Sequence, residues 1–351
     1  ALAMDAVQAA NSGHPGMPMG MADAATALFC EHLKFDAASP DWPDRDRFVL
    51  SAGHGSMLIY ALLHLTGYED MTIEQIRNFR QLGARTAGHP EFGHAKGIET
   101  TTGPLGQGIA NAVGMAMAER HMAARYGDDL VNHRTYVIAG DGCLMEGVSH
   151  EAASMAGHMK LGRLIVLFDD NSISIDGSTD LSTSDDTSGR FEAYGWQVLS
   201  CDGHDMDAVS AAISAAQADD RPSLICCKTI IGLGAPNKQG TSGVHGAPLG
   251  DAEIALARET LGWPHPAFEI PTDILAEWRA VGARGAAAHQ SWQDRHAASQ
   301  NKTAFDAAIA NDFDKNVAAA VLAWKNQLAS APQKLATRVA SQKAIEAILP
   351  A

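Results

Sequence analysis

The sequence predicts an α/β protein built on a parallel sheet with helices on both faces, followed by a helical connector. Short apolar runs alternate with alanine-rich helical stretches up to about residue 265, a pattern typical of parallel strands covered on both faces. From about residue 264 the composition shifts to Ala, Gln, Asn and charged residues, with helical periodicity and no strand signal. A length of 351 residues also exceeds the size at which one core usually stops growing, so more than one domain is expected.

The expected elements follow one another in this alternating order. The strands are the short apolar runs, which lie at residues 47–51, 135–139, 163–168, 196–201 and 223–229. The helices are the longer stretches between them, at residues 21–34, 107–126, 146–159 and 206–218. Small residues at Gly108, Ala112, Gly114 and Ala116 suggest that the helix containing them packs tightly against a neighbour.

Three segments are expected along the chain. Residues 1–265 form the α/β domain, residues 266–332 a helical extension or linker, and residues 333–351 the start of a further domain. Ser330-Ala331-Pro332 interrupts the helical pattern before that last segment. Because the chain starts inside one helical pattern and stops inside another, we expect it to be a fragment.

Composition and charge exclude several classes of protein. A net charge of −15 argues against a nucleic-acid partner, since phosphate backbones select basic surfaces. No apolar run is long enough for a transmembrane helix, and no signal peptide is recognisable, so no membrane partner is expected. The five cysteines have neither metal-ligand nor disulfide-framework spacing, which favours a reducing cytoplasm.

Gly140-Asp141-Gly142 and Asn171 form the most specific local signal. Each follows an apolar strand run, and a helical stretch separates the two. In a right-handed βαβ unit the parallel strands end at the same edge of the sheet, where such folds bind ligands. One carboxylate and one amide oxygen would therefore lie side by side, a donor set that suits Mg2+ or Ca2+ holding a diphosphate. A plain strand-end turn is the alternative for Gly-Asp-Gly alone, but Asn171 at this spacing makes the combination more specific.

Histidines in glycine-containing loops are the second signal. His14, His54, His89 and His245 each lie beside glycine, and three of these loops also contain proline. Glycine leaves room for a substrate beside an imidazole, which can donate and accept protons near neutral pH. Exposed turn histidines are the alternative for any one loop, whereas four such loops favour a functional cluster. Zinc is disfavoured because no His-Glu-x-x-His or Cys-x-x-Cys motif occurs.

A glycine-rich turn at residues 101–108 opens the helix expected from residue 107. Such a turn can bring backbone N–H groups to a phosphate. It lacks the third glycine of the dinucleotide fingerprint and the Gly-Lys of a Walker loop. Taken alone, it is more simply a helix-entry turn.

Together these residues resemble the transketolase family, whose members use thiamine diphosphate. The resemblance covers almost the whole chain, and it is carried by the following segments: Met4–Val7, Ser12–Gly16, Asp46–Ser56, Thr100–Asn111, Gly140–Gly147, Asp169–Ile175, Lys228–Gly232 and His245–Pro248. Many thiamine diphosphate enzymes share only the Gly-Asp-Gly and Asn element, so the histidine loops make the assignment specific. The implied fold is the thiamine-diphosphate-binding fold, with residues 1–265 as its pyrophosphate-binding domain.

The resemblance also implies roles for individual residues. The metal, Mg2+ or Ca2+, would be held by the side chains of Asp141 and Asn171 and by the backbone carbonyl of Ile173. Contacts to thiamine diphosphate would come from His54, Gly103, Pro104, Leu105, Gly142, Asn171 and His245.

Catalytic and substrate-binding roles are implied in the same way. His14 and His245 would line the reacting centre and handle the donor's C3 hydroxyl proton and the acceptor's carbonyl oxygen. His89 would hold a hydroxyl of the two-carbon fragment. Arg338 would bind the substrate's phosphate.

The implied activity is transfer of a two-carbon ketol unit from a ketose phosphate to an aldose phosphate. Xylulose 5-phosphate and ribose 5-phosphate represent these substrates, in the pentose phosphate pathway or the Calvin cycle. The cofactor performs the electronic step, and the protein orients it and moves protons. The family is a homodimer with active sites at the subunit interface.

One departure from the family pattern bears on activity. The family's second domain holds the aminopyrimidine ring and supplies an activating glutamate; in this chain it would begin near Leu335 and stop at Ala351. We therefore expect residues 1–351 alone to show little or no turnover. Two alternatives stay open: a dihydroxyacetone synthase-like ketol transferase, separable by comparing formaldehyde with ribose 5-phosphate as acceptor, and a non-catalytic diphosphate-binding subunit of a split transketolase.

Overall fold

The computed structural model of the protein describes residues 1–310 and 314–349. The chain divides into two compact units, residues 1–292 and 293–351, which are described separately. The segment boundaries expected near residues 265 and 332 remain predictions.

A five-stranded parallel sheet forms the centre of the first unit, and it confirms the predicted fold class. The strands are β1 (Arg47–Leu50), β2 (Thr135–Gly140), β3 (Leu164–Asp170), β4 (Gln197–Asp202) and β5 (Ser223–Lys228). They lie side by side in the order β1-β2-β3-β5-β4. The three central strands are buried along almost their whole length, which explains their continuous apolar runs.

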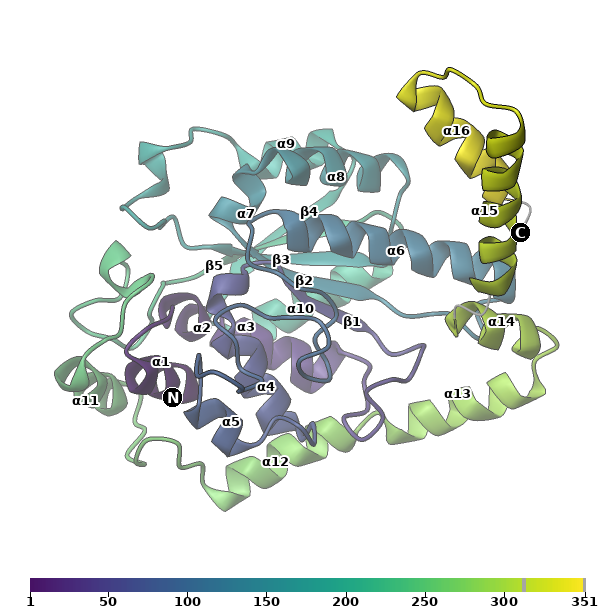
Figure 1. The fold of residues 1–351 in the computed structure, drawn as a ribbon. Helices are drawn as coiled ribbons and strands as arrows, with labels where there is room; N and C mark the ends of the chain where they lie inside the picture. Colours follow the sequence, from purple (N-terminus) through teal and green to yellow (C-terminus); the bar gives the residue numbers. More distant parts are fainter. Residues whose placement is uncertain (311–313, 350–351) are drawn as a thin grey trace. The chain divides into compact units, whose positions relative to one another are not determined.

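Helices cover both faces of this sheet (Figure 1). One face carries α6 (Gln107–Tyr126), α8 (Gly147–His158) and α9 (Thr187–Ala193). The opposite face carries α10 (Met206–Ala218), and α3 (Ala22–Ala27) packs on α10. Aliphatic and aromatic side chains from both faces join one core with the strands.

The small residues of α6 lie on two different faces of that helix. Gly108, Ala112 and Ala116 are spaced four residues apart and are buried, and a Cβ at Gly108 would lie only 2.5 Å from the Cα of Ser51. Gly114 is exposed and has no neighbour within 4 Å. The expectation that it takes part in tight packing is therefore wrong, because residue 114 falls outside the four-residue spacing.

The helix expected at residues 21–34 is shorter and changes type. It consists of α3 followed by a π-helical turn, η1 (Leu28–His32). In this turn the N–H of Leu33 donates to the carbonyl of Leu28, which leaves the Phe29 carbonyl without its helical donor. Nη2 of Arg284 donates to that carbonyl (3.2 Å) and to the carbonyl of Leu33 (2.9 Å), so both are satisfied.

The remaining elements of the first unit lie around this centre. They are α1 (Leu2–Ala10), α2 (Gly16–Gly20), η2 (Gly53–Gly55), α4 (Met57–Thr66), α5 (Ile73–Arg77), α7 (Asp141–Met145), η3 (Thr179–Leu181), η4 (Ser242–Val244), α11 (Asp251–Thr260), α12 (Thr272–Ala283) and α13 (Ala286–Ala298), the last of which crosses into the second unit. A smaller core of Met4, Ile231, Ala235, Val244, Leu249 and Ala257 joins α1, α11 and the segment after β5.

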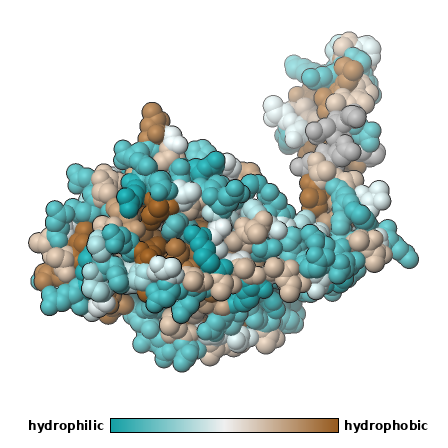
Figure 2. Space-filling view, turned by 90° about the horizontal axis from the view of Figure 1, so that it is seen from below, coloured by the Kyte–Doolittle hydropathy of each residue, from teal (hydrophilic) through white to brown (hydrophobic). Residues whose placement is uncertain are grey.

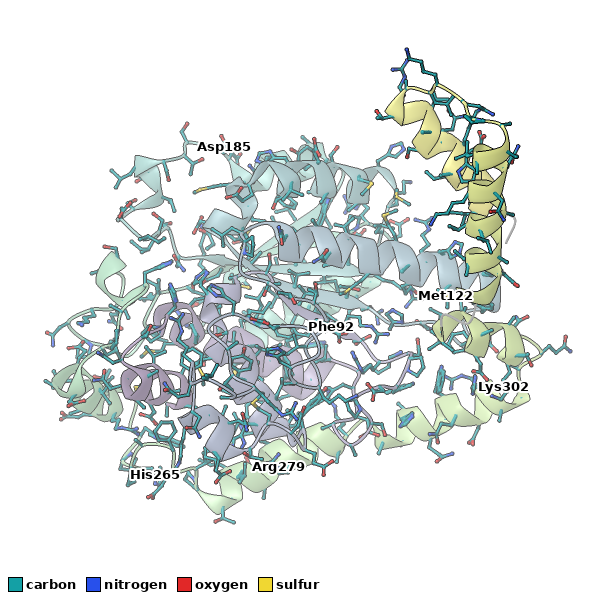
Figure 3. The ribbon with its side chains drawn as sticks, in the orientation of Figure 1. Phe92, Met122, Asp185, His265, Arg279 and Lys302 are labelled. Atoms are coloured by element: carbon teal, nitrogen blue, oxygen red, sulfur yellow. The ribbon has the colours of Figure 1, made fainter. Side chains whose placement is uncertain are left out.

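Close backbone contact fixes α12 against α4. A Cβ at Gly282 would overlap the carbonyl oxygen of Thr66, and one at Gly67, at the end of α4, would lie 2.7 Å from Nη1 of Arg279. Arg279 is labelled on α12 in Figure 3. Seen from below, the surface is mainly hydrophilic, with a group of apolar residues left of centre and others at separate places (Figure 2). A pocket lined by apolar side chains, among them Leu62 and Trp278, lies between α1, α4 and α12.

The described residues of the second unit form helices joined by short loops. It contains α14 (Lys302–Ile309), α15 (Asp314–Ser330) and α16 (Thr337–Ile348), and α15 packs beside α16. The break between the last two helices falls at the predicted interruption after Ser330. No helix in the two described ranges is long and apolar enough to cross a membrane.

Candidate functional site

The carboxyl ends of β2 and β3 bring the two parts of the first sequence signal together. The two strands are parallel neighbours, and Gly140 is the register partner of Asp169. Asp141 follows β2 directly as the first residue of α7, and Asn171 follows β3. The predicted placement of these residues at one edge of the sheet is therefore confirmed.

The carboxylate of Asp141 faces this edge with an unused oxygen. Its Oδ2 atom is buried and has no hydrogen-bond partner. Burial, and then the nearby charges of Asp170 and Asp169, raise the pKa of Asp141 to about 7. A cation at this position would favour the charged form and satisfy the free oxygen.

The amide of Asn171 is held in one orientation. Its Nδ2 donates to Oδ2 of Asp169 at 2.9 Å, and its Oδ1 accepts from the backbone N–H of Ile173 at 2.9 Å. Ser172, between Asn171 and Ile173, has a φ of 59°, in the left-handed region, which gives the chain a sharp turn.

Oxygen donors predominate at this position. Among residues 1–310 and 314–349, no group of three or more His, Cys, Asp or Glu side chains is placed to hold a metal ion. One carboxylate, one amide oxygen and one backbone carbonyl nevertheless fit a hard cation that takes its other ligands from a phosphate. The free oxygen of Asp141 is the observation that favours such an ion.

Three of the predicted histidines meet opposite this edge, each from a different loop. His14 lies just before α2, His54 in η2, and His245 directly after η4. The ring centroid of His14 is 5.1 Å from that of His54 and 5.7 Å from that of His245, and the rings of His54 and His245 stack at 5.1 Å.

His89 lies beside the glycine-rich turn and lines the same cavity as the other three histidines. A Cβ on Gly103 would lie 3.3 Å from the His89 ring. The loop of His89 is tied to α4, because Tyr60 Oη donates to the carbonyl of Ala87 at 2.9 Å and Ser56 Oγ to that of Gly88 at 3.0 Å.

Burial keeps these imidazoles neutral at pH 7. Burial, with the neighbouring His245, Arg80 and His89, lowers the pKa of His14 to about 4. Burial and the adjacent imidazoles lower the pKa of His54 to about 3. Burial also lowers the pKa of His89 and of His245. The Nδ1 atoms of His14 and His245 are buried without a hydrogen-bond partner, so each could bind a polar ligand group.

Glycine permits close approach at two points of this arrangement. A Cβ on Gly53 would lie 2.8 Å from the backbone nitrogen of Gly103, so His54 and the glycine-rich turn could not be as close with another residue there. A Cβ on Gly246 would lie 3.1 Å from the ring of His14.

Both groups of predicted residues, those at the strand ends and the four histidines, line one cavity of about 430 Å3, a volume typical of a small-molecule site. Ten predicted residues border it: His14, His54, His89, Gly103, Leu105, Asp141, Gly142, Asn171, Ile173 and His245. Pro104 is exposed and is not among the lining residues. Arg338 is an exposed residue of α16 in the second unit, and its role remains a prediction.

The cavity also has walls that the sequence reasoning did not identify. They are formed by Met17, Ala52, Cys143, Asp169, Ser174, Ile175, Asp176 and Ile231, whereas Gly140, which also lines the cavity, belongs to the first sequence signal. Asp169 could have been identified, because it precedes Asn171 by two positions at a strand end. The apolar members carry no local signal that distinguishes them from core residues.

Comparison with known proteins identifies the family. The family profile described as "Transketolase, thiamine diphosphate binding domain" matches residues 1–320. The chain is 64% identical to transketolase of Cereibacter sphaeroides over 345 residues, covering 98% of this chain and 52% of that protein. It is 59% identical to transketolase of Rhodobacter capsulatus over 351 residues, covering 99% of this chain and 52% of that protein.

Solved structures agree with these relatives. A transketolase of Campylobacter jejuni matches with a TM-score of 0.86 and 43% identity, over 90% of this chain and 49% of that one. A Pichia stipitis transketolase in complex with sedoheptulose 7-phosphate matches with a TM-score of 0.82 and 46% identity, over 86% of this chain and 45% of that one. The chain thus spans about half the length of the curated relatives it matches. Sequence, fold and the residues gathered at this cavity agree, and the chain belongs to the transketolase family, of which it contains the thiamine diphosphate binding domain.

Proposed function

We propose that this chain binds the diphosphate of thiamine diphosphate through a divalent cation, Mg2+ or Ca2+, at the edge formed by β2 and β3. The observation that carries the proposal is the buried, unpartnered Oδ2 of Asp141 in the same cavity as the amide of Asn171. Asp141, Asn171 and the carbonyl of Ile173 would ligate the ion. Gly103, Leu105, Gly142, His54 and His245 would contact the cofactor, with Pro104 shaping the turn between the first two.

The complete protein would transfer a two-carbon ketol unit from a ketose phosphate to an aldose phosphate. The bound cofactor supplies the carbanion chemistry that breaks and forms the carbon–carbon bond. The neutral imidazoles of His14 and His245 would accept the proton of the donor's C3 hydroxyl and donate to the acceptor's carbonyl oxygen. His89 would bind a hydroxyl of the transferred fragment, and Arg338 the substrate phosphate.

Sugar phosphates of the xylulose 5-phosphate and ribose 5-phosphate class are the proposed substrates. Support comes from the relative crystallised with sedoheptulose 7-phosphate. The family resemblance supports two further proposals. The protein would form a homodimer with active sites at the subunit interface, and it would act in the pentose phosphate pathway or the Calvin cycle. A cytoplasmic location is consistent with the five cysteines, all of which are free thiols.

Metal-dependent cofactor binding tests the proposal. Isothermal titration of the 351-residue chain with thiamine diphosphate should give binding in the presence of Mg2+ and lose it in the presence of EDTA. Asp141→Ala should abolish the Mg2+-dependent binding, because it removes the only carboxylate among the proposed ligands. Asp128→Ala, in an exposed loop after α6, is the matched control. Unchanged binding by Asp141→Ala would refute the assignment.

A further inference from the structure

We propose that Asp169 and Thr229 form a positioning pair that fixes the Asn171 amide with its oxygen toward the metal. The inference rests on the proposed function, because it concerns the ion that would hold the diphosphate. In this proposal neither Asp169 nor Thr229 is a metal ligand, and both act by orienting Asn171.

Asp169 is a buried carboxylate that accepts hydrogen bonds but forms no ion pair among the described residues. It is 1% exposed. Its Oδ1 accepts a hydrogen bond from Oγ1 of Thr229, and its Oδ2 accepts one from Nδ2 of Asn171 at 2.9 Å. In the part of the chain that the structure describes, no Lys, Arg or His forms an ion pair with it. A buried carboxylate without a cationic partner is costly, and a nearby bound cation would offset that cost.

The hydrogen bonds around Asn171 permit only one orientation of its amide. In the observed orientation the amino group faces the carboxylate of Asp169 and the oxygen faces the N–H of Ile173. Rotation of the amide by 180° would set oxygen against carboxylate oxygens and an amino group against an N–H. A carbonyl oxygen accepts two hydrogen bonds or ligands, so one lone pair of Oδ1 stays available for a cation.

The backbone around Thr229 is fixed by strand pairing and by hydrogen bonds of its neighbour Ile230. It follows β5, which is the neighbour of β3, with Asp169 in register with Cys227. The N–H of the next residue, Ile230, donates to Nε2 of His204 at 2.9 Å, and Nδ1 of His204 lies 3.2 Å from Oδ2 of Asp23. The hydroxyl of Thr229 therefore reaches Asp169 from a fixed backbone.

The competing explanation is that Asp169 and Thr229 only tie two strand ends together. The two explanations predict different results. A purely structural pair would affect the free energy of unfolding and leave the Mg2+ requirement of cofactor binding unchanged. A positioning pair would raise the Mg2+ concentration needed, because outer-shell partners of metal ligands commonly change metal affinity 10- to 100-fold.

Three variants of the 351-residue chain separate these explanations. Thr229→Val removes the donor to Asp169 at nearly constant volume, Thr229→Ser retains a hydroxyl, and Asp169→Asn retains the shape without the charge. Thr260→Val is the matched control, because Thr260 is an exposed residue of α11 whose hydroxyl donates to the carbonyl of Leu256. Calorimetry at fixed thiamine diphosphate gives the half-saturating Mg2+ concentration, and urea unfolding without metal gives the stability of each variant.

We expect Thr229→Val and Asp169→Asn to raise the half-saturating Mg2+ concentration about 10- to 100-fold, and Thr229→Ser to restore a value near that of the wild type. Folded Thr229→Val or Asp169→Asn protein with the wild-type Mg2+ requirement would overturn the inference. Absence of Mg2+-dependent binding in the wild type would instead overturn the proposed function itself.

Discussion

At the scale of single residues, His54 illustrates how burial sets chemistry. Its ring lies 5.1 Å from the rings of both His14 and His245, so protonating one imidazole places a positive charge beside two others. Burial has the larger effect, because the charged form must be desolvated. Together these effects hold His54 neutral with a pKa of about 3. A neutral ring can donate one hydrogen bond and accept another, which suits the contact proposed between His54 and the cofactor.

A pH dependence of stability follows from this low pKa. The unfolded chain binds a proton at His54 near pH 6.5, whereas the folded chain does so only near pH 3. The unfolded state therefore holds more protons between these values, and stability falls as the pH decreases from about 6.5, with a slope of up to about 1.4 kcal/mol per pH unit.

The variant His54→Gln should weaken that dependence, because glutamine does not titrate. Urea unfolding of wild type and variant at pH 7 and pH 5 provides the measurement. The stability difference between the two pH values should be smaller in the variant. An equal difference would show that His54 is already free to protonate in the folded state.

At the scale of secondary structure elements, glycine decides how closely α8 approaches its neighbours. A Cβ at Gly157 would overlap the carbonyl oxygen of Tyr194, which lies between α9 and β4. This helix is joined to the site through α7, which begins at Asp141 and directly precedes α8. A shift of α8 would be transmitted to the segment that carries this carboxylate.

Gly157→Ala should therefore destabilise the protein by about 1–3 kcal/mol, the usual cost of overpacking. Gly114→Ala is a matched control, since Gly114 is also a helical glycine but is exposed with nothing within 4 Å. That change should stabilise the protein by about 0.5–1 kcal/mol through helix propensity. Urea unfolding of both variants tests the pair, and similar effects in the two would contradict the packing described for α8.

At the scale of the whole molecule, the folded core belongs to the first unit. Both clusters of buried apolar residues lie before residue 292. In the second unit, described for residues 293–310 and 314–349, the large side chain buried in the structure is that of Phe305. The segments that carry the cavity also lie before residue 292, since its lining runs from His14 to His245.

A chain ending at Ala298, the last residue of α13, should consequently keep the fold and the cofactor site. We expect its thermal unfolding to remain cooperative, with a midpoint within a few degrees of that of residues 1–351, and its Mg2+-dependent binding of thiamine diphosphate to be retained. Circular dichroism and calorimetry give these two measurements. Loss of cooperative unfolding would mean that the second unit contributes to the stability of the first.

The sequence by itself determined the strand–helix alternation, the parallel sheet, and the metal and histidine signals. These depend on local patterns: α6 and α10 were predicted with their observed bounds because their periodicity is long and uninterrupted. The apolar runs before Asp141 and Asn171 placed them at strand ends, and the geometry of a βαβ unit placed both at one edge of the sheet.

The tertiary structure alone decided the features that depend on contacts between distant residues. The π-helical turn at Leu28–His32 has carbonyl oxygens that accept hydrogen bonds from the distant Arg284. Gly114 is exposed because the opposite face of α6 meets the core. The role inferred for Asp169 depends on Thr229, sixty positions later, which only the pairing of β3 with β5 brings near. Local sequence fixes which residue types are available at a strand end, whereas the order β1-β2-β3-β5-β4 fixes which of them meet.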